Sequence, residues 1–377
     1  GKMNQNKNIL LKIALLSCAV VTASINAIAG NIPAIAESFS DVPVHIIELI
    51  TTIPSLSMMI AILCSSLISG VIGNKRTVLI GLLLCGLGGV APYIFQDIII
   101  MMVTRLLFGF GVGLISSTLL IMIIYFFDGK TRSQMIGLQG SVGGLGSLIC
   151  TYIAGQLLMF GWNVSFLTYL VSFIVFLIVF LYVPNVTDVQ SSNEHSGSKI
   201  CWSKIFLYAV LSFISVTLAT FFVIKCSTLL ILNEYGSVQD GSLLVMFISA
   251  GSLVSGAMYG NIYNKLKNKS LILFYLICAI SFVIASASRS LLLTLLSAFI
   301  LGYGYMAFVP FLQEKVGIYG NKGTTTLLVF QSLGSFIAPY FGAILSYFSD
   351  TLSHQFFIAG LSYIVLMLVA YIIKDFT

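Results

Sequence analysis

The chain has 377 residues, of which 58% are hydrophobic and only 8% are charged. Soluble globular proteins carry roughly 25% charged residues, so this composition excludes an ordinary soluble domain. The formal net charge is +6, but the basic residues are dispersed between apolar runs instead of gathering on one face, and we therefore expect no nucleic-acid partner. The chain is predicted to lie in a lipid bilayer, which we expect to be the plasma (cytoplasmic) membrane.

Apolar runs follow one another along almost the whole chain. A transmembrane helix needs about 20 mostly apolar residues. The first run is too long for the apolar core of a signal peptide, so we expect it to be retained. Breaking the sequence wherever charged or turn residues cluster predicts an all-α integral membrane protein with twelve transmembrane helices, at 9–36, 43–72, 77–96, 98–127, 132–160, 163–184, 205–232, 240–263, 270–288, 290–313, 323–349 and 354–373.

One long polar stretch, residues 185–204, interrupts the apolar runs. Its Asn, Ser, Asp, Glu and Gly residues cannot bury themselves, so it is predicted to be a cytoplasmic linker. The linker divides the chain into an N-terminal six-helix bundle, 1–184, and a C-terminal six-helix bundle, 205–377. With both termini in the cytoplasm, nearly all of the 18 lysine and arginine residues fall on the inner side, as the positive-inside rule requires.

The two halves repeat short motifs in the same order and at nearly constant spacing. Such repeats mark transporters whose substrate site lies between two related bundles. We therefore predict pseudo-symmetric bundles related by an axis along the membrane normal. The matching pairs are Gly70-Val-Ile72 with Gly260-Asn-Ile262, Gly109-x-Gly111 with Gly302-x-Gly304, and Gly146-Ser147 with Gly334-Ser335.

The fourth span carries Arg105-Leu-Leu-Phe-Gly109-Phe-Gly111, which resembles the R-x-x-x-G-x-G pattern of the major facilitator superfamily. The fifth span resembles the glycine-rich antiporter helix of the drug and metabolite exporters in that family, without its Gly-Pro pair; close helix packing explains the same glycines equally well. These glycines are Gly137, Gly140, Gly143, Gly144 and Gly146. The resemblance implies a secondary transporter that works by alternating access.

The superfamily also has a loop between helices 2 and 3, G-x-L-x-D-R-x-G-R-K, that latches helix ends through charge pairs. This chain keeps the glycine and the basic end of that loop and lacks its Asp, and the repeat in the second half has Asn and Lys where the family has Asp and Arg. The resemblance therefore implies a weakened latch and an altered balance between conformers. The latch residues would be Gly73, Asn74, Lys75, Arg76, Asn264 and Lys265.

Two cations lie inside predicted spans, at about 10 Å from the outer boundary. Intramembrane charge is costly, which makes Arg105 and Lys225 candidates for a function. In one interpretation both face a central cavity and bind an anionic or zwitterionic group. In the other, the Lys225 side chain extends to the interface and Arg105 bonds carbonyls of a neighbouring helix.

No Asp or Glu occupies the middle of any predicted span. The multidrug exporters of the family that this chain resembles bind cations through buried carboxylates, so the resemblance disfavours an exporter of cationic drugs. Glu48 is the one acid clearly inside an outer helix end; it is either the proton-coupling residue or a surface residue. Asn26, Asn31, Gln139 and Gln331 either line the substrate path or form hydrogen bonds between helices.

No nucleotide-binding G-x-x-x-x-G-K-[ST] occurs, so we expect an ion or solute gradient, with a proton as the coupling ion, to drive transport. No HExxH or GxSxG motif occurs either, and we expect no enzyme activity, cofactor or metal. The leading hypothesis is a monomeric, proton-coupled exporter of a metabolite or drug. The alternative is uptake or exchange of a small organic anion held by Arg105 and Lys225. In both, the partners are the bilayer and a small-molecule substrate that is anionic, zwitterionic or neutral.

Overall fold

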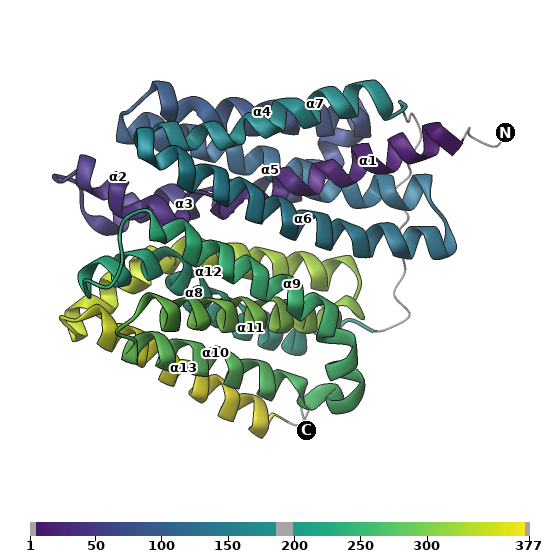
Figure 1. The fold of residues 1–377 in the computed structure, drawn as a ribbon. Helices are drawn as coiled ribbons and strands as arrows, with labels where there is room; N and C mark the ends of the chain where they lie inside the picture. The colour runs from purple at the N-terminus through teal and green to yellow at the C-terminus, as the bar shows by residue number, and fades with distance from the viewer. Residues whose placement is uncertain (1–4, 186–198, 374–377) are drawn as a thin grey trace. The chain divides into compact units, whose positions relative to one another are not determined.

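The structure is a computed structural model in which residues 5–185 and 199–373 are described; most of the expected linker lies outside these ranges. Within them the chain is helical and contains no strand (Figure 1). The N-terminal half consists of α1 (Gln5–Thr22), η1 (Ala23–Asn26), η2 (Ala29–Asn31), α2 (Ile32–Ser38), α3 (Val44–Ile72), α4 (Asn74–Ile94), α5 (Ile98–Phe126), α6 (Gly129–Leu157), η3 (Leu158–Phe160), η4 (Val164–Leu170) and α7 (Val171–Tyr182). The C-terminal half consists of α8 (Trp202–Leu232), α9 (Asp240–Leu266), η5 (Lys267–Lys269), α10 (Ser270–Ala287), α11 (Leu291–Gly317), α12 (Asn321–Phe348) and α13 (Leu352–Ile372).

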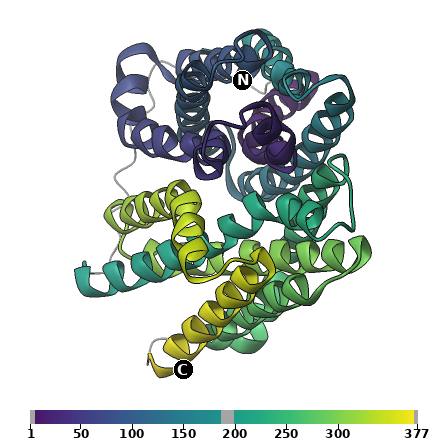
Figure 2. The same cartoon turned by 90° about the vertical axis from the view of Figure 1, so that its left-hand side faces the viewer.

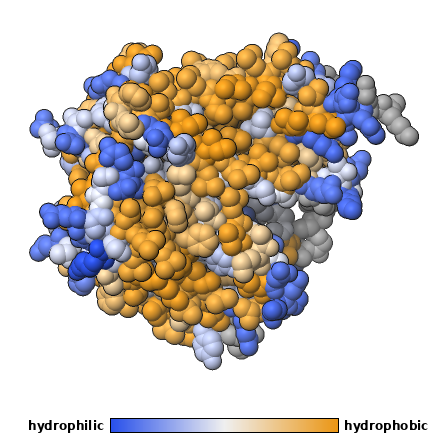
Figure 3. Space-filling view, viewed as in Figure 1, coloured by the Kyte–Doolittle hydropathy of each residue, from blue (hydrophilic) through white to orange (hydrophobic). Residues whose placement is uncertain are grey.

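In the described part of the chain, 11 helical segments are long and apolar enough to cross a membrane. One of them, Asp240–Ala287, contains 48 residues and includes both α9 and α10. The twelve-span prediction counts these two helices separately and stays a prediction, as does the cytoplasmic side of the termini. On the face shown in Figure 3, hydrophobic side chains cover the middle of the helices and hydrophilic ones gather near the helix ends, which is the surface that a bilayer requires.

The helices pack into two compact units. Unit 1 consists of Gly1–Ala27 and Ile53–Asn193, and unit 2 consists of Ile28–Thr52 and Glu194–Thr377. The segment 28–52 therefore packs with the C-terminal helices, although the sequence places it in the N-terminal bundle. Its η2 and α2 lie against α8 and α9, which accounts for this assignment.

In unit 1, two glycines of α5 bring neighbouring helices close together. A Cβ atom at Gly109 would overlap the backbone of Pro54 in α3. A Cβ atom at Gly111 would lie 2.9 Å from Sγ of Cys85 in α4. The first glycine thus lets α5 approach α3, and the second lets it approach α4.

Unit 2 repeats this arrangement around α11. A Cβ atom at Gly302 would overlap the backbone of Ile248 in α9, and one at Gly304 would lie 2.5 Å from Sγ of Cys278 in α10. The same glycine spacing therefore makes the same kind of contact in both units, and in each unit the second glycine faces a cysteine, Cys85 or Cys278. This correspondence supports the duplication that the sequence motifs predict.

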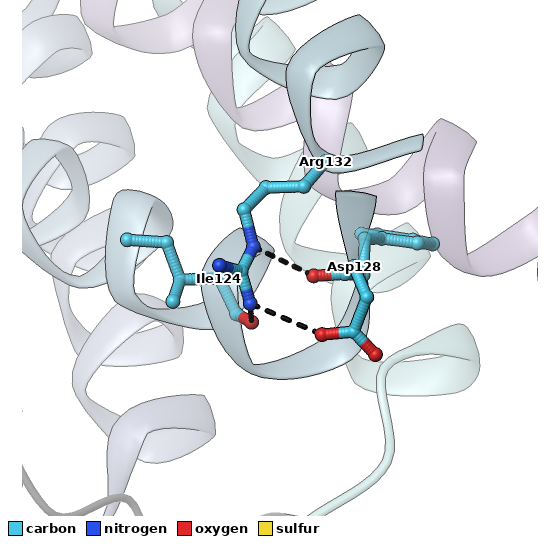
Figure 4. Close-up of polar contacts among 4 residues, drawn as sticks. Ile124, Asp128 and Arg132 are labelled. Atoms are coloured by element: carbon cyan, nitrogen blue, oxygen red, sulfur yellow. Dashed lines mark hydrogen bonds and ion pairs between the residues drawn. The ribbon is translucent and has the colours of Figure 1, made fainter. Parts of the chain in front are cut away.

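The corner between α5 and α6 is closed by the side chain of Arg132 (Figure 4). Its guanidinium donates to the carbonyls of Phe127 at 2.8 Å and Ile124 at 2.7 Å, and to the Asp128 carboxylate at 3.2 Å. The last carbonyls of a helix have no partner within the helix. Arg132 therefore caps α5 and fixes the start of α6.

The glycine contacts predict an unequal response to alanine at two glycines of unit 2. Gly302→Ala should lower the free energy of unfolding by about 1 to 3 kcal/mol, because the added methyl group must displace backbone. Gly256→Ala in α9 is the matched control, since no described atom lies within 4 Å of its Cβ position. Thermal unfolding of the two purified variants measures the difference, and equal melting temperatures would contradict the close approach of α11 to α9.

Candidate functional site

An ion pair joins α3 to α8 inside unit 2. Glu48 lies one turn after the start of α3, and Lys225 lies two turns before the end of α8. The Lys225 Nζ atom is 2.7 Å from Oε1 of Glu48. The side chain of Glu48 is 1% exposed and that of Lys225 is 13% exposed, so the surface interpretation of Glu48 is wrong.

Apolar groups surround this pair. A Cβ atom at Gly342 of α12 would lie 3.2 Å from Cε of Lys225 and 3.3 Å from the ring of Phe221. The lysine stem and the phenylalanine ring therefore both lie against α12 where that helix has no side chain. Within the described part of the chain, no hydrogen-bond donor other than Lys225 satisfies the Glu48 oxygens. Each charge therefore depends on the other, because an isolated charge inside a membrane helix is strongly unfavourable.

Contacts on either side of Glu48 dock the segment 28–52 onto the C-terminal helices. A Cβ atom at Gly30 would overlap the backbone of Gly241, where α9 begins. The Thr52 hydroxyl donates to the carbonyl of Phe336 in α12 at 3.4 Å. Glu48 lies between these two contacts in the sequence, so the segment that carries it is fixed at both ends.

Arg105 lies in unit 1 and is fully buried. Its guanidinium carbon is 4.6 Å from the ring centroid of Phe108 and 5.3 Å from that of Tyr169, and Nη2 donates to the carbonyl of Ile25 at 3.4 Å. The carbonyl contact is the one that the second interpretation of the sequence expects. A role of Arg105 in binding substrate stays a prediction.

The predicted span 9–36 is not one continuous helix, and Arg105 lies against the break. The α-helix ends at Thr22 and is followed by two 3-10 turns before α2 begins. Breaking a membrane helix leaves carbonyl groups that need new donors. Arg105 supplies one for Ile25. The carbonyl of Ser24 accepts from the Ala27 N–H at 3.0 Å and also from the Tyr169 hydroxyl at 3.3 Å.

The four amide side chains are divided between the two units. Asn26 is exposed and Gln139 is partly exposed in unit 1, whereas Asn31 is buried and Gln331 partly buried in unit 2. Gln331 Nε2 donates to Oγ of Ser212 at 2.8 Å, which joins α12 to α8. For Gln331 the structure thus shows a hydrogen bond between helices, while the substrate path stays a prediction for all four.

A family model described as Major Facilitator Superfamily matches residues 14–316. The chain belongs to this superfamily. Its members are transporters and not enzymes. Among the described residues, no group of three or more His, Cys, Asp or Glu side chains could hold a metal ion. No curated protein sequence matches the chain.

Solved structures of other transporters have the same fold. A D-xylose-proton symporter is 13% identical with a TM-score of 0.77 and covers 97% of each chain. The human organic anion transporter MFSD10 is 14% identical with a TM-score of 0.68 and covers 97% of this chain and all of the other. The xylose transporter XylE from E. coli, in a partially occluded inward-open conformation, is 12% identical with a TM-score of 0.75. The match covers 96% of this chain and 98% of the XylE chain.

The superfamily loop between helices 2 and 3 lies between α3 and α4, where Gly73 has a positive φ of 90°. Lys75 Nζ donates to the carbonyl of Phe180 at the end of α7, 2.9 Å away, and Asn74 is buried while Arg76 is exposed. Lys75 therefore caps a helix within its own unit. In the second half, Asn264 and Lys265 are exposed near the end of α9, and the predicted weakening of the latch stays a prediction.

Opposite charges near helix ends are the sequence signal for the Glu48–Lys225 pair. Glu48 lies about 6 Å from the start of α3 and Lys225 about 10 Å from the end of α8, and the two carry opposite charges. Their pairing would follow if α3 and α8 were known to be neighbours. No single-sequence pattern supplies that neighbourhood, nor the close approach of Gly30 to Gly241.

The pair predicts a non-additive response to mutation in this superfamily member. Lys225→Met and Glu48→Gln should each lower the free energy of unfolding by about 3 to 5 kcal/mol, because each variant leaves the other charge buried without its partner. The double variant should recover much of that loss, because neither charge remains. Thermal unfolding of the four proteins measures the coupling, and strictly additive losses would show that the two side chains do not interact.

Proposed function

We propose that this protein is a secondary transporter that moves a small organic anion together with a proton. Lys225 is the anion site and Glu48 is the proton site. The observation that supports this proposal is the buried contact of 2.7 Å between them, because it makes the two ligands depend on each other.

The coupling follows from competition for one ammonium group. An ionised Glu48 neutralises Lys225 and leaves no net charge to attract an anion. When a proton neutralises Glu48, Lys225 loses its counter-charge, and a substrate carboxylate or similar anion restores the pairing. Anion and proton therefore bind together, and the protein carries both in the same direction.

Alternating access needs contacts that exist in one conformer and break in another. We propose that the contacts of the segment 28–52 are of this kind. Besides the packing of η2 and α2 on α8 and α9, they include a glycine pair, one ion pair and one long hydrogen bond at Thr52. If a substrate anion took the place of the Glu48 carboxylate beside Lys225, the ion pair between α3 and α8 would break. Substrate binding would thus change the balance between conformers.

A second candidate is proton-coupled export of a metabolite or drug. At Gly137 and Gly140 of α6, no described atom lies within 4 Å of the Cβ position, whereas at Gly146 a Cβ atom would lie 2.7 Å from a methyl carbon of Val20. Close packing therefore accounts for Gly146 and not for the other two, which favours a functional role for that end of the glycine-rich helix. In proton antiport, unlike cotransport, substrate binding displaces a proton.

We further propose that the protein is a monomer in the cytoplasmic membrane, with both termini in the cytoplasm. In this topology α9 and α10 cross separately, which gives twelve spans. The lengths of 27 and 18 residues correspond to about 40 and 27 Å of helix, against a hydrocarbon core of about 30 Å. The neighbours in the same fold include a proton symporter and an organic anion transporter, so both coupling and cargo are within the range of this architecture.

Proton flux into proteoliposomes tests the proposal. Vesicles that contain the protein and the trapped pH dye pyranine should acidify inside when succinate is added outside, and D-xylose, alanine and ethidium should give no such change. Glu48→Gln should abolish the anion-driven acidification, and Lys225→Ala should abolish anion transport. Asp350→Asn, which alters an exposed acid, is the control and should behave like the wild type.

Two results would contradict cotransport. Anion-driven acidification that persists in Glu48→Gln would place the proton site elsewhere. Alkalinisation inside the vesicles when ethidium enters would show antiport and favour the exporter.

A further inference from the structure

A groove of about 590 Å³ lies where α8 and α12 begin. These two helices lie side by side in unit 2 (Figure 2). The residues that line it include Trp202, Phe206, Asn321, Lys322, Thr325 and Thr326. None of them takes part in the Glu48–Lys225 site, so this groove needs a separate explanation.

The two walls of the groove differ in chemistry. The α8 wall is aromatic: the ring centroids of Trp202 and Phe206 are 5.8 Å apart, and Phe206 is 6.1 Å from Phe330 of α12. Trp202 is 45% exposed and Phe206 is 48% exposed. These rings therefore form an apolar surface that continues from the helix ends toward the interior of the bilayer.

The α12 wall is polar and cationic at its beginning. Lys322 is exposed, and Thr325 contributes a hydroxyl one turn further along. Neither α8 nor α12 contains an acidic residue, so no carboxylate on the two helices competes for Lys322. The first N–H groups of a long helix add partial positive charge at the same end.

The groove is amphipathic along the membrane normal. Val329 lies seven residues after Lys322, about 10 Å deeper along the helix, and it closes the apolar end. Tryptophan is enriched at the membrane–water boundary, and the alternation of helices puts this end on the lysine-rich side that the sequence assigns to the cytoplasm. Basic pockets between helices on that side are suited to phosphate-bearing headgroups.

We propose that this groove binds an anionic phospholipid of the cytoplasmic leaflet. The headgroup phosphate pairs with Lys322 and the start of α12, and an acyl chain lies along Phe206 and Val329. A lipid fits better than a soluble phosphate, because the exposed aromatic wall next to the cation needs an apolar partner. This site is independent of the transported substrate and of the direction of transport.

Lipid binding to the full-length protein in detergent tests this proposal, with native mass spectrometry as the readout. Phosphatidylglycerol should bind more tightly than phosphatidylcholine of the same acyl chains, and glycerol 3-phosphate, which has no acyl chain, should bind far more weakly. Lys322→Ala should weaken phosphatidylglycerol binding about fivefold, the contribution of one basic residue at a membrane surface. Phe206→Ala should weaken the binding of both phospholipids.

Lys269→Ala is the matched control, because Lys269 is an exposed lysine of η5, between α9 and α10, and lies outside the groove. It should leave phosphatidylglycerol binding unchanged. Equal binding of the two phospholipids, or equal effects of Lys322→Ala and Lys269→Ala, would overturn the site. Binding of glycerol 3-phosphate as tight as that of phosphatidylglycerol would also overturn it, in favour of a soluble anion.

Discussion

Lys225 carries an ammonium group in the interior of a membrane helix, and the carboxylate of Glu48 compensates for that position from 2.7 Å away. Because the two charges come from distant parts of the sequence, their pairing fixes which helices are neighbours. The segment 28–52 lies against α8, α9 and α12 with Glu48 between its glycine contact and its hydrogen bond. A change in the charge of either partner therefore acts on the packing of this segment, and the proposed coupling of proton and anion depends on this link.

The close glycine contacts recur in both units, whereas Lys225 and Arg105 each occur in one half alone. Gly109 and Gly111 in unit 1 and Gly302 and Gly304 in unit 2 make equivalent approaches, and a cysteine faces the second glycine in each case. In the register set by these glycines, Ile32 is the counterpart of Lys225 and Ala298 that of Arg105. Lys225 and Arg105 thus stand where the other half has an apolar residue, and charged positions of this kind inside a membrane protein are candidates for a specific function.

Much of the fold could be predicted because hydropathy is a property of local sequence. Each predicted apolar run corresponds to helical structure, and the major facilitator superfamily was identified from the Arg105–Gly111 motif and confirmed over residues 14–316. The break after Thr22 was missed because the apolar neighbours of Ser24, Asn26 and Asn31 keep the whole run hydrophobic. The donors that reach the carbonyls of this break, from Arg105 and Tyr169, come from distant parts of the sequence. The packing of the segment 28–52 with the C-terminal helices was missed for a similar reason, since it depends on contacts between residues about 200 positions apart.

The most direct measurement of the coupling between Glu48 and Lys225 is the number of protons taken up when an anion binds. Isothermal titration calorimetry of the purified protein with benzoate, repeated in two buffers of different ionisation enthalpy, gives this number. We expect the wild type to take up close to one proton for each anion bound and Glu48→Gln to take up none while still binding the anion. Anion binding without proton uptake in the wild type, or the same uptake in Glu48→Gln, would contradict the proposal that this ion pair couples the two ligands.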